Sequence, residues 1–303
     1  MQHYTFSPVH THTYPYSYKV MEQDIVSLQQ LYPDILDTQV FSFSTQGRAL
    51  YDIILGNSQA PHTLLVQAGI HGREWLNCLL VMMQISALCQ CIQRQKSKTF
   101  YYKGISYHKL FSQVCVHFLP MTNPDGVTIS QQACPLWKAN ARGVNLNSNF
   151  RAGFDTLPST KSPHYKDYKG ASFHSETESK ALVKFTKSLM PDAVISYHET
   201  GSLIYQNYGQ QGALKKRCNR LVHAIADVSG YPIDPMYAVS GGYSDWCVRC
   251  MHIPACTIET GSGKAPLGYE QLPSIWQQNK LVIPAAAFSI RSFAYGEAAS
   301  PAP

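Results

Sequence analysis

The sequence predicts an α/β domain whose sheet is covered by helices on both faces. Two observations lead to this fold class. Short aliphatic runs alternate with longer runs of helical length along most of the chain, and several of the short runs are apolar throughout. Strands of that kind are typical of a sheet buried between two helix layers. With 303 residues, of which 45% are hydrophobic and 15% charged, the chain can supply the core of one large domain.

The first half of the chain contains three predicted strands and one predicted helix. YDIILG (51–56) and HTLLVQAGI (62–70) are short aliphatic runs of strand length. EWLNCLLVMMQISALCQCIQRQ (74–95) is too long for a strand and has a long apolar face, so we expect a helix there. Its apolar part is too short and too polar to span a membrane. VCVHFLPM (114–121) is a buried strand that runs into a predicted turn, NPDG (123–126).

The second half continues the alternation. SETESKALVKFTKSLM (175–190) predicts a helix that opens with Ser175 and Glu178 in capping-box spacing. Further strands are expected at 192–199 and 254–260, and further helices at 213–230 and 274–296. No repeat, low-complexity block or linker interrupts the pattern, so we expect one domain.

Charge and cysteine content narrow the function classes. The formal net charge is +6, and no basic stripe is interleaved with aromatic residues, so nucleic-acid binding is not expected. The N-terminus lacks the basic and apolar regions of a signal peptide. Nine cysteines, an odd number, are scattered without a framework spacing, which favours reduced thiols. These features predict a cytoplasmic protein without a membrane segment, although release to the cell wall stays open.

Three potential metal ligands stand at predicted strand ends. His71 and Glu74 follow the strand over 62–70, and His198 closes the strand over 192–199. In such sheets functional residues gather just beyond the carboxyl ends of the strands. Two histidines and a glutamate are a common catalytic zinc set that leaves a fourth position for water, whose pKa zinc lowers to about 7. The sequence therefore indicates a zinc site, with His71 and Glu74 supplied by a single turn.

A hydrolytic zinc site also needs a general base and a group that stabilises the oxyanion. Glu259 ends the strand over 254–260 and is the candidate base, and Arg142, in the segment KANARGVNLN, is the candidate oxyanion partner. Each residue also has an ordinary structural interpretation, His198 as a hydrogen-bonded core histidine and Glu259 as a helix cap. Only the joint arrangement at strand ends favours the metal site.

Several segments resemble the zinc carboxypeptidase family, and the likeness runs through most of the chain after about residue 20. GIHGREW resembles the H-x-x-E segment of the family, which implies His71 and Glu74 as zinc ligands and Arg73 as a cation facing the substrate. SYHETGSLIY resembles the segment that carries the third ligand, which implies His198. NPDGV matches a turn that follows a core strand in these enzymes. The resemblance implies one zinc ion in a single domain with a mixed, twisted sheet of about eight strands and helices on both faces.

Two further segments extend the likeness. MYAVSGGYSDW resembles the segment with the mobile tyrosine, which implies Tyr237 as a substrate contact, and CTIETG resembles the strand with the general base, which implies Glu259. In the mechanism so implied, Glu259 moves a proton from water to the leaving amine while zinc and Arg142 polarise the carbonyl. The resemblance also divides the chain, into an N-terminal extension (1–20), a zinc peptidase catalytic domain (21–299) and a tail (300–303).

One departure from the family concerns the substrate. Its carboxypeptidases bind the terminal carboxylate with an Asn-Arg pair, whereas GVNLNSNF here places Ser148 after Asn147. A serine does not replace a fixed bidentate cation. The position that corresponds to the floor of the side-chain pocket is Ser244, which is small and polar and suits neither a large aromatic side chain nor a simple lysine. We expect Asn147, Ser148 and Ser244 to contact a substrate other than an ordinary C-terminal peptide.

Four segments, KANARGVNLN, HYKDYKGASFHSETES, GSLIYQNYG and SGGYSDW, are similar to the bacterial γ-D-glutamyl-meso-diaminopimelate peptidases of this family. This likeness implies a zinc metallopeptidase that cuts the stem peptides of peptidoglycan. Three alternatives remain: a general metallocarboxypeptidase that removes C-terminal residues, a deacylase of the same superfamily, and a non-catalytic protein that binds muropeptides.

Overall fold

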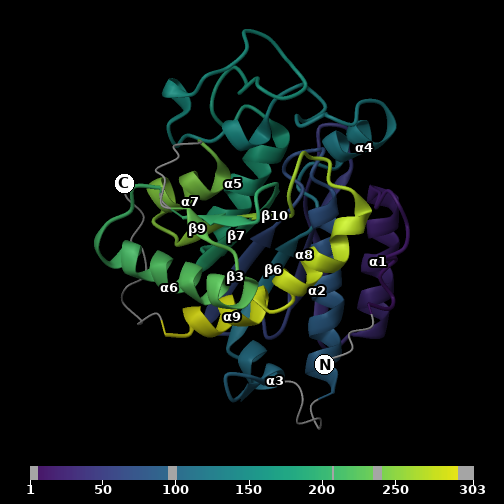
Figure 1. The fold of residues 1–303 in the computed structure, drawn as a ribbon, viewed down its shortest axis with the longest axis vertical. Helices are drawn as coiled ribbons and strands as arrows, with labels where there is room; N and C mark the ends of the chain where they lie inside the picture. Colours follow the sequence, from purple (N-terminus) through teal and green to yellow (C-terminus); the bar gives the residue numbers. More distant parts are fainter. Residues whose placement is uncertain (1–5, 95–100, 207, 235–240, 293–303) are drawn as a thin grey trace.

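The structure, a computed structural model, describes residues 6–94, 101–206, 208–234 and 241–292 (Figure 1). The strands are β1 (Leu36–Phe43), β2 (Ala49–Leu55), β3 (His62–Gln67), β4 (Tyr101–Tyr102), β5 (Ile105–Ser106), β6 (Val114–Leu119), β7 (Ala193–Glu199), β8 (Leu203–Tyr205), β9 (Ile233–Asp234) and β10 (Ala255–Thr260). The α-helices are α1 (Tyr18–Leu31), α2 (Leu76–Gln93), α3 (Tyr107–Phe111), α4 (Pro124–Gln132), α5 (Thr177–Leu189), α6 (Gly212–Ser229), α7 (Tyr243–Met251), α8 (Leu272–Asn279) and α9 (Val282–Ile290). Three short 3₁₀ helices are η1 (Leu146–Ser148), η2 (Phe154–Thr156) and η3 (Tyr269–Gln271).

The main sheet is mixed, as predicted, and has eight strands in the order β1-β2-β6-β3-β7-β10-β8-β9. Its four central strands, β6, β3, β7 and β10, run parallel. Strands β1 and β2 on one side, and β8 on the other, pair antiparallel. The parallel centre brings the carboxyl ends of β3, β7 and β10 to one edge of the sheet, which is where this type of fold places its functional residues.

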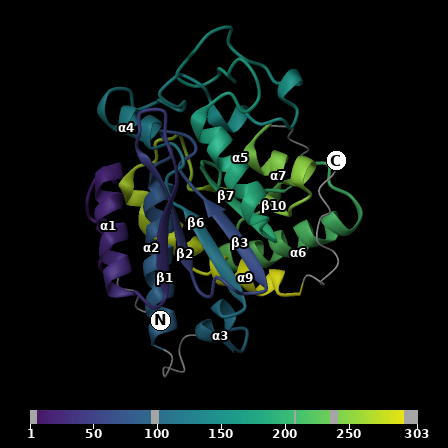
Figure 2. The same cartoon turned by 180° about the vertical axis from the view of Figure 1, so that it is seen from behind.

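Two apolar cores cover the two faces of the sheet, so the predicted layer order is confirmed. In β3, Leu64 and Val66 belong to a core shared with α2, α8 and α9, and Leu65 between them belongs to a core shared with α5 and α7. This division follows from the alternation of side chains along a strand. We call the two sides the α2 face and the α7 face. Figure 1 shows α8 and α9 in front of the sheet, and Figure 2 shows the sheet from its other side.

The predicted C-terminal helix is wrong in one respect, because it divides into α8 and α9. Pro284 explains the break. Proline has no backbone N–H, and its ring would clash with the carbonyl of Lys280, four residues earlier, in a continuous helix. Helix α8 therefore ends at Asn279, with Lys280 as its C-cap residue, and α9 starts at Val282 after the non-helical Leu281.

Two helix starts also differ from the prediction. Residues 123–126 open α4 rather than a simple turn, because the Asn123 side chain accepts a hydrogen bond from the Gly126 N–H and caps the helix. The capping box expected at α5 is wrong, since Glu176 is the N-cap residue. Glu178 instead accepts a hydrogen bond from the backbone N–H of Thr45, on the turn between β1 and β2.

Helix α1 was not predicted from the sequence, and the expected boundary after residue 20 falls within it. The segment before it packs on the domain. Tyr16 is buried, and its hydroxyl donates a hydrogen bond to Asp24 in α1. The ring of Phe6 lies 4.7 Å from the ring of Trp276 in α8. The described part of the N-terminal segment is thus bound to the same cores as the rest of the chain.

All nine cysteines are free, and seven of them are buried, as expected of reduced thiols in apolar runs. Among the described residues one helix, α2, is long and apolar enough to cross a membrane, so the expectation that this run is too short and too polar to do so was wrong. Nearly all of α2 is buried between the sheet and its neighbouring helices, as is usual for the core helix of a globular domain.

Candidate metal centre

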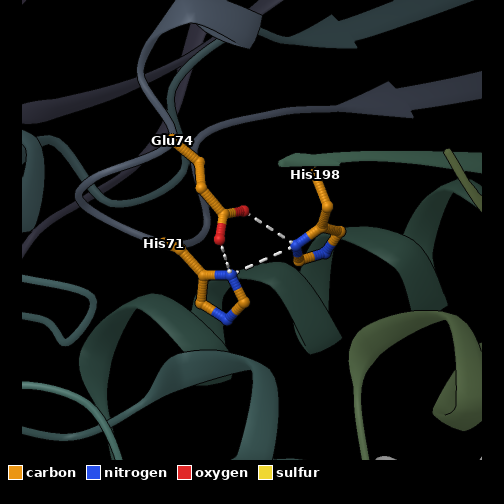
Figure 3. Close-up of side chains that lie close together, drawn as sticks. All are labelled: His71, Glu74 and His198. Carbon is orange, nitrogen blue, oxygen red and sulfur yellow. Dashed lines mark hydrogen bonds and ion pairs between the residues drawn. The ribbon is translucent and has the colours of Figure 1, made fainter. Parts of the chain in front are cut away.

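His71, Glu74 and His198 lie together at the carboxyl edge of the sheet (Figure 3). His71 and Glu74 come from the turn between β3 and α2, and His198 comes from β7. All three side chains are buried. We call the segment that carries His71 and Glu74 the ligand turn. It is tightly packed, because a Cβ on Gly72 would lie 2.4 Å from the carbonyl oxygen of Gly126. Glycine at this position lets the ligand turn rest directly on α4.

The three side chains converge on one point. The Glu74 carboxylate places Oε1 2.8 Å from His71 Nδ1 and Oε2 3.0 Å from His198 Nδ1. The two Nδ1 atoms are 3.2 Å apart. At most one of two facing nitrogens can carry a proton toward the other, so at least one lone pair points into the cluster. Two imidazole nitrogens and a carboxylate oxygen within 4.8 Å of one another fit the donor set of a zinc ion.

The electrostatics of the cluster agree with cation binding. Burial lowers the pKa of His71 to about 3, so its ring is neutral and has a free lone pair at pH 7. Burial also acts to lower the pKa of His198, but the hydrogen bond and charge of Glu74 raise it. A metal ion that binds such a cluster takes the place of any proton on its ligand atoms.

Asn145 contacts the His71 ring on the side away from Glu74, and it was not predicted from the sequence. Its Oδ1 accepts a hydrogen bond from His71 Nε2 at 3.2 Å, which leaves Nδ1 of the same ring for the metal. The same oxygen accepts the backbone N–H of Asn147 within η1. Asn145 and His71 are 74 residues apart in the chain, so no local pattern could have revealed the contact.

Glu199 supports the cluster from the other side. Its backbone N–H donates to Glu74 Oε2 at 3.3 Å, and its own carboxylate accepts the backbone N–H of Leu267. The backbone N–H groups at the start of α2 also act on this carboxylate. Glu199 therefore connects β7 with α2 and with the loop after β10.

Glu259, the predicted general base, lies beside His198, its register partner on the neighbouring strand. Its Oε2 is buried and has no hydrogen-bond partner among the described residues. Burial raises the pKa of Glu259 to about 7, with a further increase from Glu74 and opposing effects from His198 and Lys138. A carboxyl group with this pKa can both accept and donate a proton near neutral pH.

The cation whose charge acts on the cluster is Lys138 rather than Arg142. The Arg142 side chain is 67% exposed and forms an ion pair with Glu176, with Nε and Oε2 3.3 Å apart. Lys138, by contrast, exerts a charge effect on His71, His198 and Glu259 alike. Its carbonyl accepts the N–H of Gly72, so its backbone is tied to the ligand turn. Sequence reasoning missed Lys138 although it stands in the same segment, four residues before Arg142.

The predicted substrate contacts occupy different places. Asn147 is half-buried, and its Oδ1 accepts the N–H of Tyr243 at the start of α7. Ser148 is half-buried, and its N–H donates to the carbonyl of Asn145. Arg73 is half-buried, and its Nε has no hydrogen-bond partner in the described part of the chain. Tyr237 lies outside the described residues.

Ser244 is buried and belongs to a chain of hydroxyl groups. Tyr208 donates to Thr257 at 2.9 Å, Thr257 donates to Ser244 at 2.9 Å, and Ser244 donates to the carbonyl of Cys256 at 3.4 Å. Thr257 stands two residues before Glu259 on β10, so both side chains point to the α7 face. We call Tyr208, Thr257 and Ser244 the hydroxyl chain. It makes the neighbourhood of Glu259 polar without adding a charge.

Comparison with known proteins gives one family match. The model of a family described as zinc carboxypeptidase matches residues 21–282. A gamma-D-glutamyl-L-diamino acid endopeptidase 1 from Lysinibacillus sphaericus is 27% identical over 288 residues, which cover 87% of this chain and 70% of that protein.

Solved structures share the fold. The crystal structure of thrombin activatable fibrinolysis inhibitor matches with a TM-score of 0.78 at 17% identity, over 92% of this chain and 75% of that one. The murein-tripeptide amidase from Escherichia coli O157 matches with a TM-score of 0.56 at 20% identity, over 84% of this chain and 91% of that one.

Proposed function

Because this chain belongs to the zinc carboxypeptidase family and is a zinc metallopeptidase, we propose that it hydrolyses the bond between γ-D-Glu and meso-diaminopimelate in peptidoglycan stem peptides. The observation that carries the substrate proposal is the uncharged hydroxyl chain, whose Thr257 stands two residues before Glu259 on β10 and on the same face of the sheet. The relative from Lysinibacillus sphaericus, named as a γ-D-glutamyl-diamino acid endopeptidase, supports the same substrate class.

In this proposal His71, Glu74 and His198 hold the zinc ion. Bound zinc supplies Lewis acidity, which polarises the scissile carbonyl and lowers the pKa of water. Asn145 keeps the His71 ring in the orientation that presents Nδ1 to the cluster. The buried carboxylate of Glu74 neutralises part of the metal charge and contacts both histidine rings.

Glu259 carries the proton. Its carboxylate takes a proton from the water that attacks the carbonyl carbon, and it delivers that proton to the nitrogen of the leaving amine as the carbon–nitrogen bond breaks. The products are a γ-carboxylate on D-Glu and a free amine on diaminopimelate, so atoms and protons balance. Lys138, whose charge reaches all three neighbouring titratable groups, stabilises the negative oxygen that develops on the carbonyl.

The substrate's chemistry matches the polar lining. Diaminopimelate ends in an ammonium and a carboxylate on the same carbon, so its far end is a zwitterion with no net charge. Each hydroxyl oxygen can accept from the ammonium, and a hydroxyl donates to the carboxylate when it exchanges its bond within the chain for one to the substrate. A buried guanidinium in that place would favour the carboxylate and repel the ammonium. The hydroxyl lining therefore favours a zwitterion over a simple side chain.

A general metallocarboxypeptidase is the second candidate, and Arg73 is the observation in its favour. Its Nε is buried without a partner among the described residues, so its guanidinium has donor capacity left for a substrate carboxylate. This reading predicts turnover of α-linked peptides with a free C-terminus. A non-catalytic binding protein is disfavoured, because the buried His-Glu-His cluster and the partner-free Glu259 oxygen carry a cost that binding alone does not explain.

Product identification tests the proposal. Zinc-loaded protein is incubated with L-Ala-γ-D-Glu-meso-diaminopimelate and, separately, with an α-linked dipeptide, and the products are identified by mass spectrometry. Release of diaminopimelate and L-Ala-D-Glu from the first substrate alone is the expected result. Cleavage of the α-linked dipeptide alone would instead support the general carboxypeptidase.

A further inference from the structure

We propose that Tyr14, together with Trp75 and Tyr269, forms a saccharide subsite that binds the muramyl sugar of a stem peptide still attached to its glycan. We call these three residues the aromatic platform. The inference rests on the proposed function for the identity of the sugar. It adds a substrate-binding surface on the acyl side of the scissile bond, which neither the metal cluster nor the hydroxyl chain supplies.

The platform combines an exposed ring with two supporting rings. Tyr14 is 59% exposed, although it is a large aromatic residue. Its ring centroid lies 5.2 Å from that of Trp75 and 6.0 Å from that of Tyr269, in T-shaped arrangements with interplanar angles of 66° and 77°. Trp75 is buried and Tyr269 is half-buried. The two inner rings therefore fix the position of a tyrosine whose remaining surface faces solvent.

The platform starts next to the metal cluster. Trp75 directly follows Glu74, and consecutive Cα atoms are about 3.8 Å apart. Trp75 belongs to the core of the α2 face, and Tyr269 packs against that core. Tyr14 precedes α1 in the chain, and Tyr269 lies between β10 and α8. Figures 1 and 2 both show α1 and the segment between β10 and α8 on the same side of the molecule. The platform is thus a neighbour of the ligand turn on the α2 face.

The hydroxyl chain lies on the opposite face of the sheet. Ser244 is in α7, and the side chain of Thr257 points to the α7 face. In this proposal the substrate has its diaminopimelate beside the hydroxyl chain and its scissile bond at Glu259, and its other half extends past the turn that carries His71 and Glu74 toward the α2 face. The acyl half of the substrate therefore leads to the aromatic platform.

The chemistry of that acyl half selects the sugar as occupant. It consists of γ-D-Glu, then L-Ala, and in intact peptidoglycan the L-Ala nitrogen is joined to the lactyl group of muramic acid. Neither amino acid has an aromatic or long apolar side chain. A pyranose ring, however, has an apolar face of C–H groups and a rim of hydroxyls, and a tyrosine offers an apolar ring face with a hydroxyl at its end. The sugar is the part of the substrate that an exposed tyrosine suits.

The chain around Tyr14 is held by contacts that do not involve its own side chain. The carbonyl of Tyr16 accepts a hydrogen bond from Gln131 in α4, and the Tyr16 hydroxyl donates to Asp24. Ser17 caps α1 through a hydrogen bond from the N–H of Val20. Because Tyr14 is mostly exposed and its neighbours are anchored, replacing its ring is expected to leave the fold intact.

Steady-state kinetics on two substrates test the subsite. The substrates are L-Ala-γ-D-Glu-meso-diaminopimelate and the same tripeptide carrying N-acetylmuramic acid, and the variants are Tyr14→Ala and Tyr14→Phe. For Tyr14→Ala we expect KM to rise about fivefold more for the muramyl substrate than for the free tripeptide, with kcat for the two substrates reduced equally or not at all. Tyr14→Phe keeps the ring and should restore most of the difference. Equal changes in KM on both substrates would overturn the inference.

Tyr101 supplies the matched control. It is 50% exposed and lies in β4, which packs against β5 and α9, elements that carry none of His71, Glu74 and His198. Tyr101→Ala removes a ring of similar exposure and should leave both KM values within twofold of the unmodified protein. A Tyr101→Ala effect as large as that of Tyr14→Ala would show that ring loss alone changes KM, and the subsite would be rejected.

A binding measurement separates this inference from the proposed function. Saturation-transfer NMR with N-acetylmuramic acid needs no hydrolysis. Transfer to the C–H protons of the sugar, lost in Tyr14→Ala and kept in Tyr101→Ala, supports the subsite even if neither tripeptide is cleaved, in which case only the proposed function fails. Cleavage of both tripeptides with equal KM and no saturation transfer would reject the subsite alone.

Discussion

Nε2 of His71 lies 3.2 Å from Oδ1 of Asn145, on the side of the imidazole ring away from Glu74. Because the amide oxygen only accepts, a metal ion on Nδ1 would leave the ring proton on Nε2, where Asn145 can accept it. The neutral amide of Asn145 polarises the His71 ring less than a carboxylate would. Substitutions of Asn145 can therefore measure how the hydrogen bond to His71 affects metal affinity.

Substitution of Asn145 should change zinc affinity in both directions. Asn145→Ala removes the acceptor, and we expect zinc to bind about 10- to 100-fold more weakly. Asn145→Asp places a carboxylate against Nε2–H and should tighten binding, since hydrogen bonds to charged acceptors are stronger. Competition with a chelator of known zinc affinity measures both effects. Unchanged affinity in both variants would remove Asn145 from the account of the metal centre.

Glu259→Gln should abolish hydrolysis and leave zinc bound. The amide cannot take a proton from water, and general-base catalysis contributes about 10²- to 10⁴-fold, so kcat should fall by roughly 10³-fold. Zinc content, measured by atomic absorption, should stay near one ion per chain, because Glu259 is outside the His71, Glu74 and His198 cluster. Near-normal turnover in this variant would exclude Glu259 as the base.

Lys138→Met and Arg142→Met form a matched pair that separates the two candidate cations. Lys138 acts electrostatically on the cluster, whereas Arg142 is exposed and paired with Glu176. Loss of a group that stabilises an oxyanion costs about 10²- to 10³-fold in kcat. We therefore expect kcat to fall about 100-fold for Lys138→Met and less than threefold for Arg142→Met. A larger fall in kcat for Arg142→Met than for Lys138→Met would support Arg142 as the residue that stabilises the oxyanion.

The pair formed by His117 and Asp52 should make stability depend on pH. Burial acts to lower the pKa of His117, but the 2.8 Å hydrogen bond from its ring to Asp52, the charge of Asp52 and the effects of Cys115 together outweigh it and raise the pKa to about 9. Since the folded pKa lies above the usual value of about 6.5, the stabilisation is complete below pH 6.5 and is lost as pH rises through 9. The free energy of unfolding should fall by roughly 2 kcal/mol between pH 7 and 9.5.

Urea unfolding across that range checks the His117 prediction, with Asp52→Asn as the control. The amide removes the charge that holds the proton on His117, so this variant should be less stable at pH 7 and should lack most of the decrease toward pH 9.5. Parallel stability curves for the two proteins would contradict the assignment.

Sequence patterns predicted the sheet and the metal cluster because both follow from local order. Strand ends place His71, Glu74 and His198 at one edge of a parallel sheet, and alternation along β3 and β7 directs the apolar residues into two cores. Pro284 divides the last helix through a clash with a carbonyl four residues earlier. That break follows from backbone chemistry and was open to prediction.

The contacts that tune the site were beyond the reach of local patterns. Asn145 meets His71 across 74 residues, and Glu178, expected to cap its own helix, instead binds the backbone of Thr45, 133 residues away. Lys138 and Arg142 lie in the same segment and are both positively charged. Only the folded chain shows that Arg142 is exposed whereas the charge of Lys138 acts on Glu259. Burial and long-range pairing decide these roles.

The most direct test of the proposed function compares two tripeptides that differ only in one linkage, L-Ala-γ-D-Glu-meso-diaminopimelate and its α-linked isomer. The ratio of their kcat/KM values, measured with zinc-loaded protein, isolates the preference for the γ bond from every other property of the substrate. We predict a preference of at least about 100-fold for the γ-linked isomer, equivalent to roughly 2.7 kcal/mol of transition-state stabilisation. Equal kcat/KM values for the two isomers, or faster cleavage of the α-linked isomer, would contradict the proposed substrate and support a general carboxypeptidase instead.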